Sequence, residues 1–246
     1  MEDRCVMCGE IIPEGRMVCP VCKERVLTKK GEQTMKARTI RETEYTWEQI
    51  EEILAAGKAR ETFGEDGQIT VQVEGIGEAV LNILDYDKDK AANKDMHTMT
   101  LQFADLLFDE MPFNEGNCNK WEKSSIRSYM NSIAFKERFE EGFRRLLVPV
   151  LKENEDRKAT LDTFFLLSVE EMKDKEKKYQ RFRSERDRVK VNPEQETEGH
   201  WTRSACRGNA YFTWNVYASG NVNNGYTAVY SFRFAPACVI GAKAIK

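Results

Sequence analysis

Four cysteines near the start of the chain form two pairs with the spacing of a metal site, Cys5 with Cys8 and Cys19 with Cys22. Two residues between thiolates let both sulfurs of a pair converge on one tetrahedral ion, and the spacer 9–18 is long enough to bring the pairs together. Four thiolates fill the coordination shell of Zn²⁺, so this zinc would be structural. We predict a zinc ribbon over residues 1–25; two disulfides or a redox pair would have the same spacing.

Other residues with catalytic or metal-binding potential are weaker candidates. Asp85, Asp87 and Asp89 alternate like the first ligands of a calcium loop, but Lys90 and Met96 stand where an EF-hand needs Gly and Glu. The chain has two histidines, neither beside a nucleophile motif, and it has no GxGxxG motif or P-loop. We therefore expect a protein that is not an enzyme.

Composition places these residues in a globular protein. The 246 residues are 41% hydrophobic and 32% charged, which excludes a disordered or collagen-like chain. No apolar run reaches the roughly 18 to 20 residues that a membrane helix needs, and the first residues do not resemble an export signal. We expect no membrane partner and no secretion through a signal peptide.

The elements that must position any site begin near Tyr45. Residues 26–44 are polar, alternate in charge and have no apolar period, which predicts a linker before a domain at 45–246. Thr46 to Gln49 form a capping box for a helix that Gly57 ends. Residues 69–73, 79–84, 99–103 and 163–167 are predicted strands, and Ser168 is a predicted helix cap. This mixture of elements predicts an α+β domain.

The middle of the chain predicts two helices with apolar stripes. The first stripe contains Ile126, Tyr129, Met130 and Ile133, and the second contains Phe135, Phe139 and Phe143 at a spacing of four. A phenylalanine stripe of this kind is far more often core than a cofactor site. The charged stretch 170–198 holds equal numbers of acidic and basic residues, which is typical of a solvated surface.

Residues 201–242 differ in composition from the rest. They hold nine of the 25 aromatic residues and five asparagines, and they lack Lys, Glu, Gln, Met, Asp, His and Leu. Tyr, Asn, Ser and Gly with few charges are typical of a binding surface built from loops. The other interpretation is a twisted sheet with aromatic residues in its core and Asn223-Asn224-Gly225 as a hairpin turn, and both can hold at once.

Several motifs resemble a bacterial and phage domain family of unknown function. Its closing module leads from a W-x-R-S motif through a variable stretch to an A-P motif, and the motifs of this chain follow the same order over about residues 45–240. They are Trp47-Glu48-Gln49-Ile50, Trp121 with Ser125-Ile126-Arg127 and Asn131, Phe164-Phe165-Leu166-Leu167-Ser168, Trp201-Thr202-Arg203-Ser204, Val216, Gly220, Ala235-Pro236-Ala237 and Ile240. The family is similar to the variable proteins of diversity-generating retroelements. This resemblance implies a C-type-lectin-like fold.

The resemblance also implies a hypervariable C-terminal surface. Retroelements of this kind convert Asn codons into NNY codons, which cannot encode Lys, Glu, Gln, Met or Trp. Residues 201–242 lack the first four, and Trp214 would be a fixed framework position. We expect a non-enzymatic, receptor-like or adhesin-like protein that binds a protein or glycan and resides in the cytoplasm or a phage particle. The expected contact residues are Arg207, Asn209, Tyr211, Phe212, Asn215, Tyr217, Asn221, Asn223, Asn224, Tyr226 and Tyr230.

Two alternatives remain open. The first is a nucleic-acid-associated regulator with a zinc ribbon, in which tail aromatics stack on bases. It is disfavoured because the basic residues of 201–246 are few and scattered. The second is an oxidase of the formylglycine-generating type, an enzyme class with a lectin-like fold, which would require Cys206 and Cys238 to be reactive.

Overall fold

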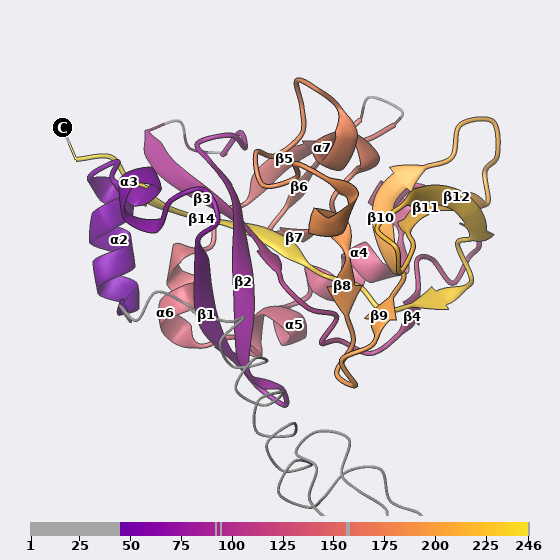
Figure 1. Ribbon diagram of the computed structural model, residues 1–246, viewed down its shortest axis with the longest axis horizontal. Helices are drawn as coiled ribbons and strands as arrows, with labels where there is room; N and C mark the ends of the chain where they lie inside the picture. The colour runs from indigo at the N-terminus through magenta and orange to yellow at the C-terminus, as the bar shows by residue number, and fades with distance from the viewer. Residues whose placement is uncertain (1–44, 92, 94, 156–157, 246) are drawn as a thin grey trace, which may run out of the picture. The chain divides into compact units, whose positions relative to one another are not determined.

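The computed structural model describes residues 45–91, 93, 95–155 and 158–245 (Figure 1). The four cysteines of the expected zinc ribbon and the expected linker 26–44 lie outside these residues. The described part combines short α-helices with mainly antiparallel sheets, so the predicted α+β class is confirmed. Within this part of the chain, no helix has the length and apolar character needed to cross a membrane.

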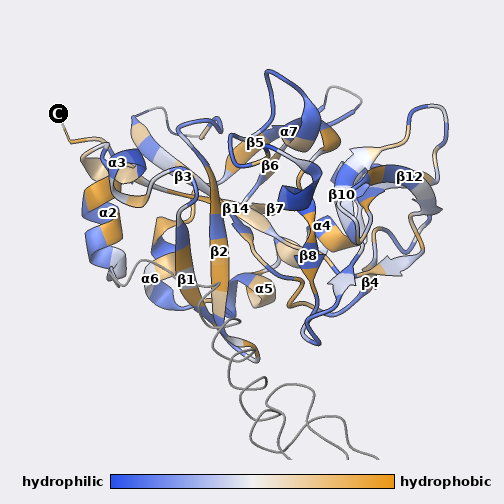
Figure 2. Ribbon diagram, viewed as in Figure 1, coloured by the Kyte–Doolittle hydropathy of each residue, from blue (hydrophilic) through white to orange (hydrophobic). Residues whose placement is uncertain are grey.

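The largest sheet has five strands in the order β1-β2-β3-β14-β7, and every neighbouring pair is antiparallel. Its strands are β1 (Gln68–Val73), β2 (Gly77–Tyr86), β3 (Met96–Phe103), β14 (Ala237–Lys243) and β7 (Phe164–Phe165). Side chains of β1 and of the first half of β2 alternate between buried and accessible positions, whereas β14 is buried over six successive residues. The C-terminal strand is therefore an interior strand of the core sheet, between β3 and β7 (Figures 1 and 2).

Short helices pack around this sheet. They are α2 (Trp47–Ala55), α3 (Ala59–Phe63), α4 (Ser125–Met130), α5 (Ile133–Glu137), α6 (Glu141–Leu146) and α7 (Val169–Lys173), with 3₁₀ turns η1 (Trp121–Lys123) and η2 (Glu185–Arg188). The capping boxes predicted at Thr46 and Ser168 are both present. Helix α2 buries Ile50 and Leu54 and contacts β14 and β3.

The helical stripes predicted in the middle of the chain are only partly correct. Ser132 caps a new helix, so the first stripe is split between α4 and α5 and Ile133 is 75% exposed. The three phenylalanines are all buried, as predicted, but they do not lie on one helix. Residue Phe139 bridges to β1, and the Glu140 N–H donates to Gln72 O at 3.2 Å. Pairing with a sheet edge has replaced helical hydrogen bonds here.

Smaller sheets extend from the core. The two-stranded sheets are β5 (Val150–Glu153) with β6 (Ala159–Asp162), β8 (Lys190–Val191) with β9 (Thr197–Glu198), and β4 (Met111–Pro112) with β13 (Ser231–Phe232). A three-stranded sheet contains β10 (His200–Ala205), β11 (Phe212–Val216) and β12 (Val222–Thr227) in that order. It lies at the opposite end of the domain from α2 (Figure 1).

Candidate ligand-binding surface

The sheet β10-β11-β12 carries most of the residues that the sequence assigned to ligand contact. Strand β11 changes register with both neighbours, between Trp201 and Ala205 of β10 and again between its own residues Thr213 and Asn215. Such bulges bend and twist a sheet locally. The sheet therefore presents an irregular surface rather than a flat one.

The turn between β11 and β12 differs from the sequence prediction. Residues 223–225 lie inside β12, and the chain reverses where the Tyr217 N–H donates to Asn221 O at 2.8 Å. Gly220 adopts a left-handed φ of 85° in this turn, a conformation that glycine allows without strain. The expected hairpin turn at 223–225 is therefore wrong.

Gly220 is also fixed by its surroundings. A Cβ atom at this position would collide with the backbone oxygen of Glu185, and the buried Arg188 donates from Nε to Gly220 O at 2.8 Å. The turn is therefore anchored on η2. These contacts give Gly220, one of the motif residues, a structural role.

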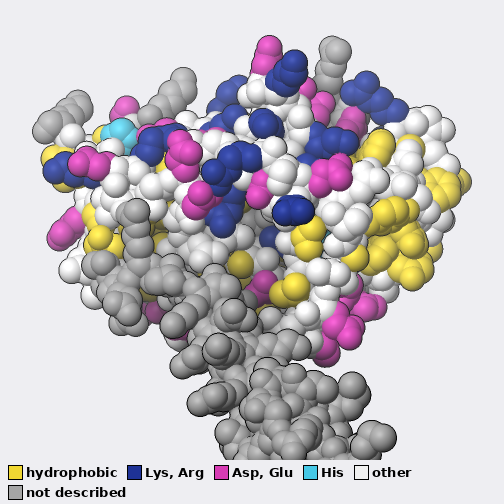
Figure 3. All heavy atoms as spheres, viewed as in Figure 1, with side chains coloured by type: hydrophobic (Ala, Val, Ile, Leu, Met, Phe, Trp, Pro, Cys, Tyr) yellow, Lys and Arg dark blue, Asp and Glu magenta, His cyan; other side chains and the backbone are white. Residues whose placement is uncertain are grey.

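Tyrosines form an accessible aromatic cluster on this sheet and its loops. Tyr226 contacts Tyr230 and Phe232 with ring centroids 4.8 Å apart in both pairs, and Tyr217 lies 6.3 Å away. Tyr230 is 50% exposed, and Tyr211, on the preceding loop, is 56% exposed. Hydrophobic side chains gather at the end of the molecule that β11 and β12 occupy (Figure 3). Aromatic rings of this kind offer large contact area at low cost in side-chain entropy.

Polar members of the expected contact set occupy different environments. Asn221 is exposed, and Asn223 and Asn224 are half-buried; Asn224 Nδ2 approaches Cys206 Sγ at 3.2 Å. Asn209 accepts the Tyr211 N–H at 2.8 Å, so its side chain orders the loop. The half-buried Phe212 lies at the start of β11, and the exposed Arg207 pairs with Glu155.

Asn215 must be removed from the expected contact set. It is fully buried in the middle strand, in register with Trp201 on one side and Asn223 on the other. Neither its amide oxygen nor its amide nitrogen has a hydrogen-bond partner among the described residues. A period of two could not reveal this burial, because the strand departs from regular register on both sides.

The W-x-R-S motif has a structural role. Trp201 is buried and donates from Nε1 to Met111 O at 3.1 Å, which attaches β10 to β4. Arg203 is buried and pairs with both carboxylate oxygens of Glu171 in α7. The motif therefore fixes β10 while the neighbouring strands and loops carry the accessible side chains.

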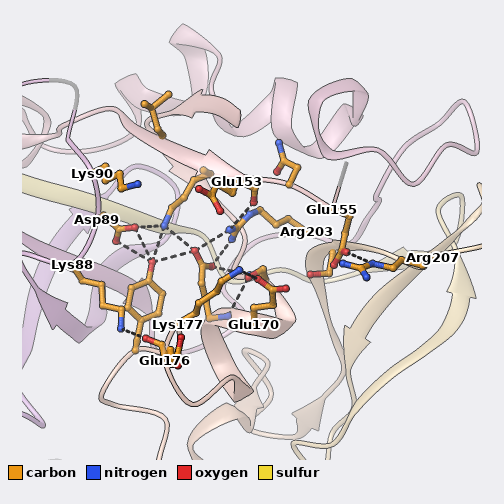
Figure 4. Close-up of a pocket in the computed structure, with 17 residues that line it drawn as sticks. Lys88, Asp89, Lys90, Glu153, Glu155, Glu170, Glu176, Lys177, Arg203 and Arg207 are labelled. Atoms are coloured by element: carbon orange, nitrogen blue, oxygen red, sulfur yellow. Dashed lines mark hydrogen bonds and ion pairs between the residues drawn. The ribbon is translucent and has the colours of Figure 1, made fainter. Parts of the chain in front are cut away.

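Arg203 also lines a charged pocket of about 660 Å³, which was not predicted from the sequence (Figure 4). In its floor, Lys152 is 2% exposed and contacts Asp89, Glu171 (3.0 Å) and the Tyr179 hydroxyl (2.7 Å). The Lys152 ammonium also lies 3.8 Å from the centre of the Phe165 ring, which is a favourable cation–π distance. Two buried cations thus face two largely buried carboxylates.

The electrostatics of this floor favour its ionised carboxylate. Burial alone would raise the pKa of Glu171, but Arg203 and Lys152 outweigh it and hold that pKa well below its usual range. Burial, reinforced by Glu171 and Asp89, raises the pKa of Tyr179 well above its ordinary value, so its hydroxyl stays protonated. The charges of the floor are therefore paired with one another, which is the arrangement of a structural network.

The inward-facing position of Lys152 has a signal in the sequence. In a strand with period two, Lys152 shares a face with the buried Val150, while Leu151 faces the other way and is 49% exposed. An inward-facing lysine requires a buried anionic partner. Glu171, the third residue after the helix cap Ser168, supplies that partner.

The cysteines of the oxidase alternative lie in unlike environments. Cys238 is 1% exposed in β14, and burial raises the pKa of its thiol. Cys206 is half-buried and directly follows β10. A buried thiol with a raised pKa is a poor nucleophile. These positions count against redox chemistry that uses both thiols.

Arginines of residues 201–242 are engaged by acidic side chains. Arg203 pairs with Glu171, Arg207 with Glu155, and Arg233 with Glu198. Residues 208–232 contain no charged side chain. Nucleic-acid binding relies on cations that contact phosphates, so this surface supports the nucleic-acid alternative poorly.

Comparison with known proteins gives one match. Residues 98–242, more than half of the chain, match the family model described as Domain of unknown function (DUF6273). The matched range includes β10, β11 and β12 as well as the residues of the charged pocket floor that follow β3. No curated protein and no solved structure matches the chain.

Proposed function

The chain belongs to the family described as Domain of unknown function (DUF6273), and we propose that it is a non-enzymatic binding protein whose ligand, a protein or a glycan, contacts the surface of β10-β11-β12. The contact residues are those of the expected set without Asn215. The accessible tyrosines at 211, 217, 226 and 230 form the centre of this surface, and Asn221, Asn223 and Asn224 supply neutral polar groups.

The exposure of Tyr211 and Tyr230 carries this proposal. Both side chains remain at least half exposed in a domain whose other large aromatic residues are mostly buried. An uncharged stretch from 208 to 232 surrounds them, and tyrosine and asparagine are the residue types that binding loops favour. Hydrogen bonds of Trp201, Arg203 and Gly220 attach the sheet to β4, α7 and η2, so the position of the sheet does not depend on a ligand.

The resemblance to variable proteins extends this proposal. We propose a C-type-lectin-like fold and a surface diversified by a retroelement, because the composition of 201–242 fits NNY-encoded variation. Deep sequencing of this coding segment in a host population tests the second part. Variation at Asn-derived codons, together with a nearby template that differs at adenines, is the expected result; a uniform segment without a template contradicts it.

Binding itself is tested with defined probes. The full chain is panned against a glycan array and a displayed library of random peptides, beside a variant carrying Tyr211→Ala and Tyr230→Ala. The proposal expects at least one probe to be retained by the natural protein and lost by the variant. Retention that the two substitutions leave unchanged would place the binding site elsewhere.

Zinc in the N-terminal segment is a separate part of the proposal. Cys5, Cys8, Cys19 and Cys22 would supply four thiolates, a donor set that suits structural Zn²⁺. Elemental analysis of the purified full chain is expected to find one zinc per chain, and Cys5→Ser with Cys19→Ser should remove it. A metal-free protein whose cysteines form disulfides would replace the zinc ribbon with a disulfide-linked segment.

A further inference from the structure

Strand β12 ends the three-stranded sheet and pairs with β11 on one side only. The Tyr217 N–H donates to Asn221 O, so these two residues form a hydrogen-bonded pair. In an antiparallel ladder, hydrogen-bonded and non-hydrogen-bonded pairs alternate, so the N–H and C=O of the next residue, Val222, point away from β11. At Asn224 and Gly225 the bulge places two residues of β12 opposite one residue of β11. Within the described part of the chain, no hydrogen bond closes the outer edge between Val222 and Tyr226.

Two other sheet edges of the domain, those of β1 and β10, are covered by the chain itself. At the edge of β1, Gln72 O accepts the Glu140 N–H, and the Glu74 N–H donates to Arg138 O at 2.7 Å. At the outer edge of β10, the Arg203 N–H donates to Leu167 O at 3.0 Å. Strand β12 has β11 as its only hydrogen-bonded neighbour among the described strands. The open edge of β12 therefore contrasts with these covered edges and belongs to the proposed binding surface.

The side chains around this edge leave it accessible to another strand. Residues 222–227 read Val-Asn-Asn-Gly-Tyr-Thr, without the lysine or proline that commonly protects edge strands from pairing. Gly225 is exposed and has no side chain to obstruct an approaching backbone. Tyr217 and Tyr226 flank the edge, so an incoming segment would meet aromatic rings and no charge.

We infer that the outer edge of β12 binds an extended, uncharged peptide segment of the ligand as a fourth strand of the β10-β11-β12 sheet. This inference rests on the proposed binding function and narrows its ligand to a protein. In this mode of recognition, main-chain hydrogen bonds supply affinity and side-chain contacts supply specificity. Backbone pairing thus persists when the side chains of the surface change, provided that the sheet is retained.

The decisive experiment changes the peptide and leaves the protein untouched. Random peptides of about 12 residues, displayed on phage, serve as the probe for the full chain. Selected peptides are then synthesised with single N-methyl groups at successive positions. If the peptide adds as a strand, the N–H groups of alternate residues face β12, so N-methylation at alternate positions should weaken binding about tenfold or more. N-methylation at the intervening positions should change binding little. Equal effects at all positions, or none, overturn the inference.

Two further measurements locate the peptide on the protein. Amide hydrogen exchange at Val222 should slow when the peptide is added, while exchange at Gln72 in the covered edge of β1 stays unchanged. Asn224→Lys should weaken peptide binding more than Asn221→Lys, because only the first places a charge within the open edge. Protection confined to β1, or a stronger effect of the turn variant, overturns the inference.

The outcomes separate this inference from the proposed function. Glycan binding that requires Tyr211 and Tyr230, without any selected peptide, overturns the inference and leaves the proposed function intact. A concentration-dependent dimer that Asn224→Lys abolishes would assign the edge to a second copy and also overturns it. If no probe binds in a way that requires Tyr211 and Tyr230, both the inference and the proposed function are overturned.

Discussion

The charged pocket beside α7 and the aromatic surface of β10-β11-β12 share strand β10 but differ in how their polar groups are used. In the pocket, Lys152 and Arg203 are buried and bonded to carboxylates. On the surface, tyrosines and asparagines are accessible and uncharged, and the backbone edge of β12 is open. The strand that joins them presents Arg203 to the pocket and stands two strands from the open edge.

This difference separates residues that hold the fold from residues available for a partner. A buried ion network favours one geometry because each lost partner leaves an uncompensated charge. An accessible neutral surface carries little of that penalty, so its side chains can change at small cost in stability. A pocket is thus a poor guide to the binding site here, because the charged groups in the floor of this one are already paired within the protein.

The largest effect is expected from Glu171→Ala. The substitution leaves Arg203 and Lys152 buried with fewer anionic partners, which should lower the free energy of unfolding by about 3–5 kcal/mol. Urea denaturation measures the change. Glu170→Ala, which removes an exposed partner of Lys177, is the matched control and should cost about 1 kcal/mol or less. Equal losses for the two variants would show that the pocket network does not stabilise the fold.

The pH dependence of the free energy of unfolding should also reflect the Glu171 carboxylate. The pKa of Glu171 is held below its unfolded value near 4.5, so the unfolded chain takes up this proton first as the pH falls. The stability that Glu171 contributes is present above about pH 4.5 and is lost below it. Between about pH 5 and pH 3, the natural protein should lose ~1–2 kcal/mol more than Glu171→Gln in urea titrations. Parallel losses for the two proteins would contradict the lowered pKa.

Substitutions on the aromatic surface should weaken ligand binding and leave the stability of the fold almost unchanged. Tyr211→Ala with Tyr230→Ala should change the free energy of unfolding by less than about 1 kcal/mol, because both rings are at least half exposed. Affinity for a selected probe should fall about tenfold or more, as measured by calorimetry. Tyr129→Ala, a 40% exposed tyrosine outside this sheet, controls for a general loss of tyrosine and should bind normally. Severe destabilisation by the double variant would make these residues core.

Salt should have the smallest effect. Residues 208–232 carry no charge and Arg207, the charged member of the contact set, is already paired with Glu155, so affinity for the probe should change less than about twofold between low and high ionic strength. Titration of the same probe in increasing NaCl measures this. A steep decline with salt would instead indicate phosphate-like or acidic contacts and would favour the nucleic-acid alternative.

Local signals in the sequence predicted the elements whose ends are set by nearby residues. The Thr46 cap, the Ser168 cap and the strand at 69–73 are confirmed because capping and alternation depend on a few adjacent side chains. The phenylalanines at 135–143 were correctly predicted as core, yet a contact with β1 breaks the helix at Phe139. Hydrophobic periodicity indicates which residues are buried, but it does not indicate a strand that is distant in sequence and pairs with the segment.

The same limit applies to the sites. Composition alone identified 201–242 as unlike the remaining chain, and the accessible tyrosines lie there. The pocket network joins Asp89, Lys152, Glu171 and Arg203 from four separate segments, and no local pattern links them. Asn215 was misassigned because the bulges on either side of β11 are set by strand pairing.

Gly220 sets a boundary on how far the surface can evolve. Any side chain there would collide with η2 and would have to adopt a left-handed backbone, so this position tolerates one amino acid. Mutational scanning should therefore find a depleted site between permissive neighbours such as Ser219 and Asn221, both of which are exposed. A library built on this domain would reach its greatest functional diversity by randomising the residues on either side of Gly220 and leaving the glycine itself unchanged.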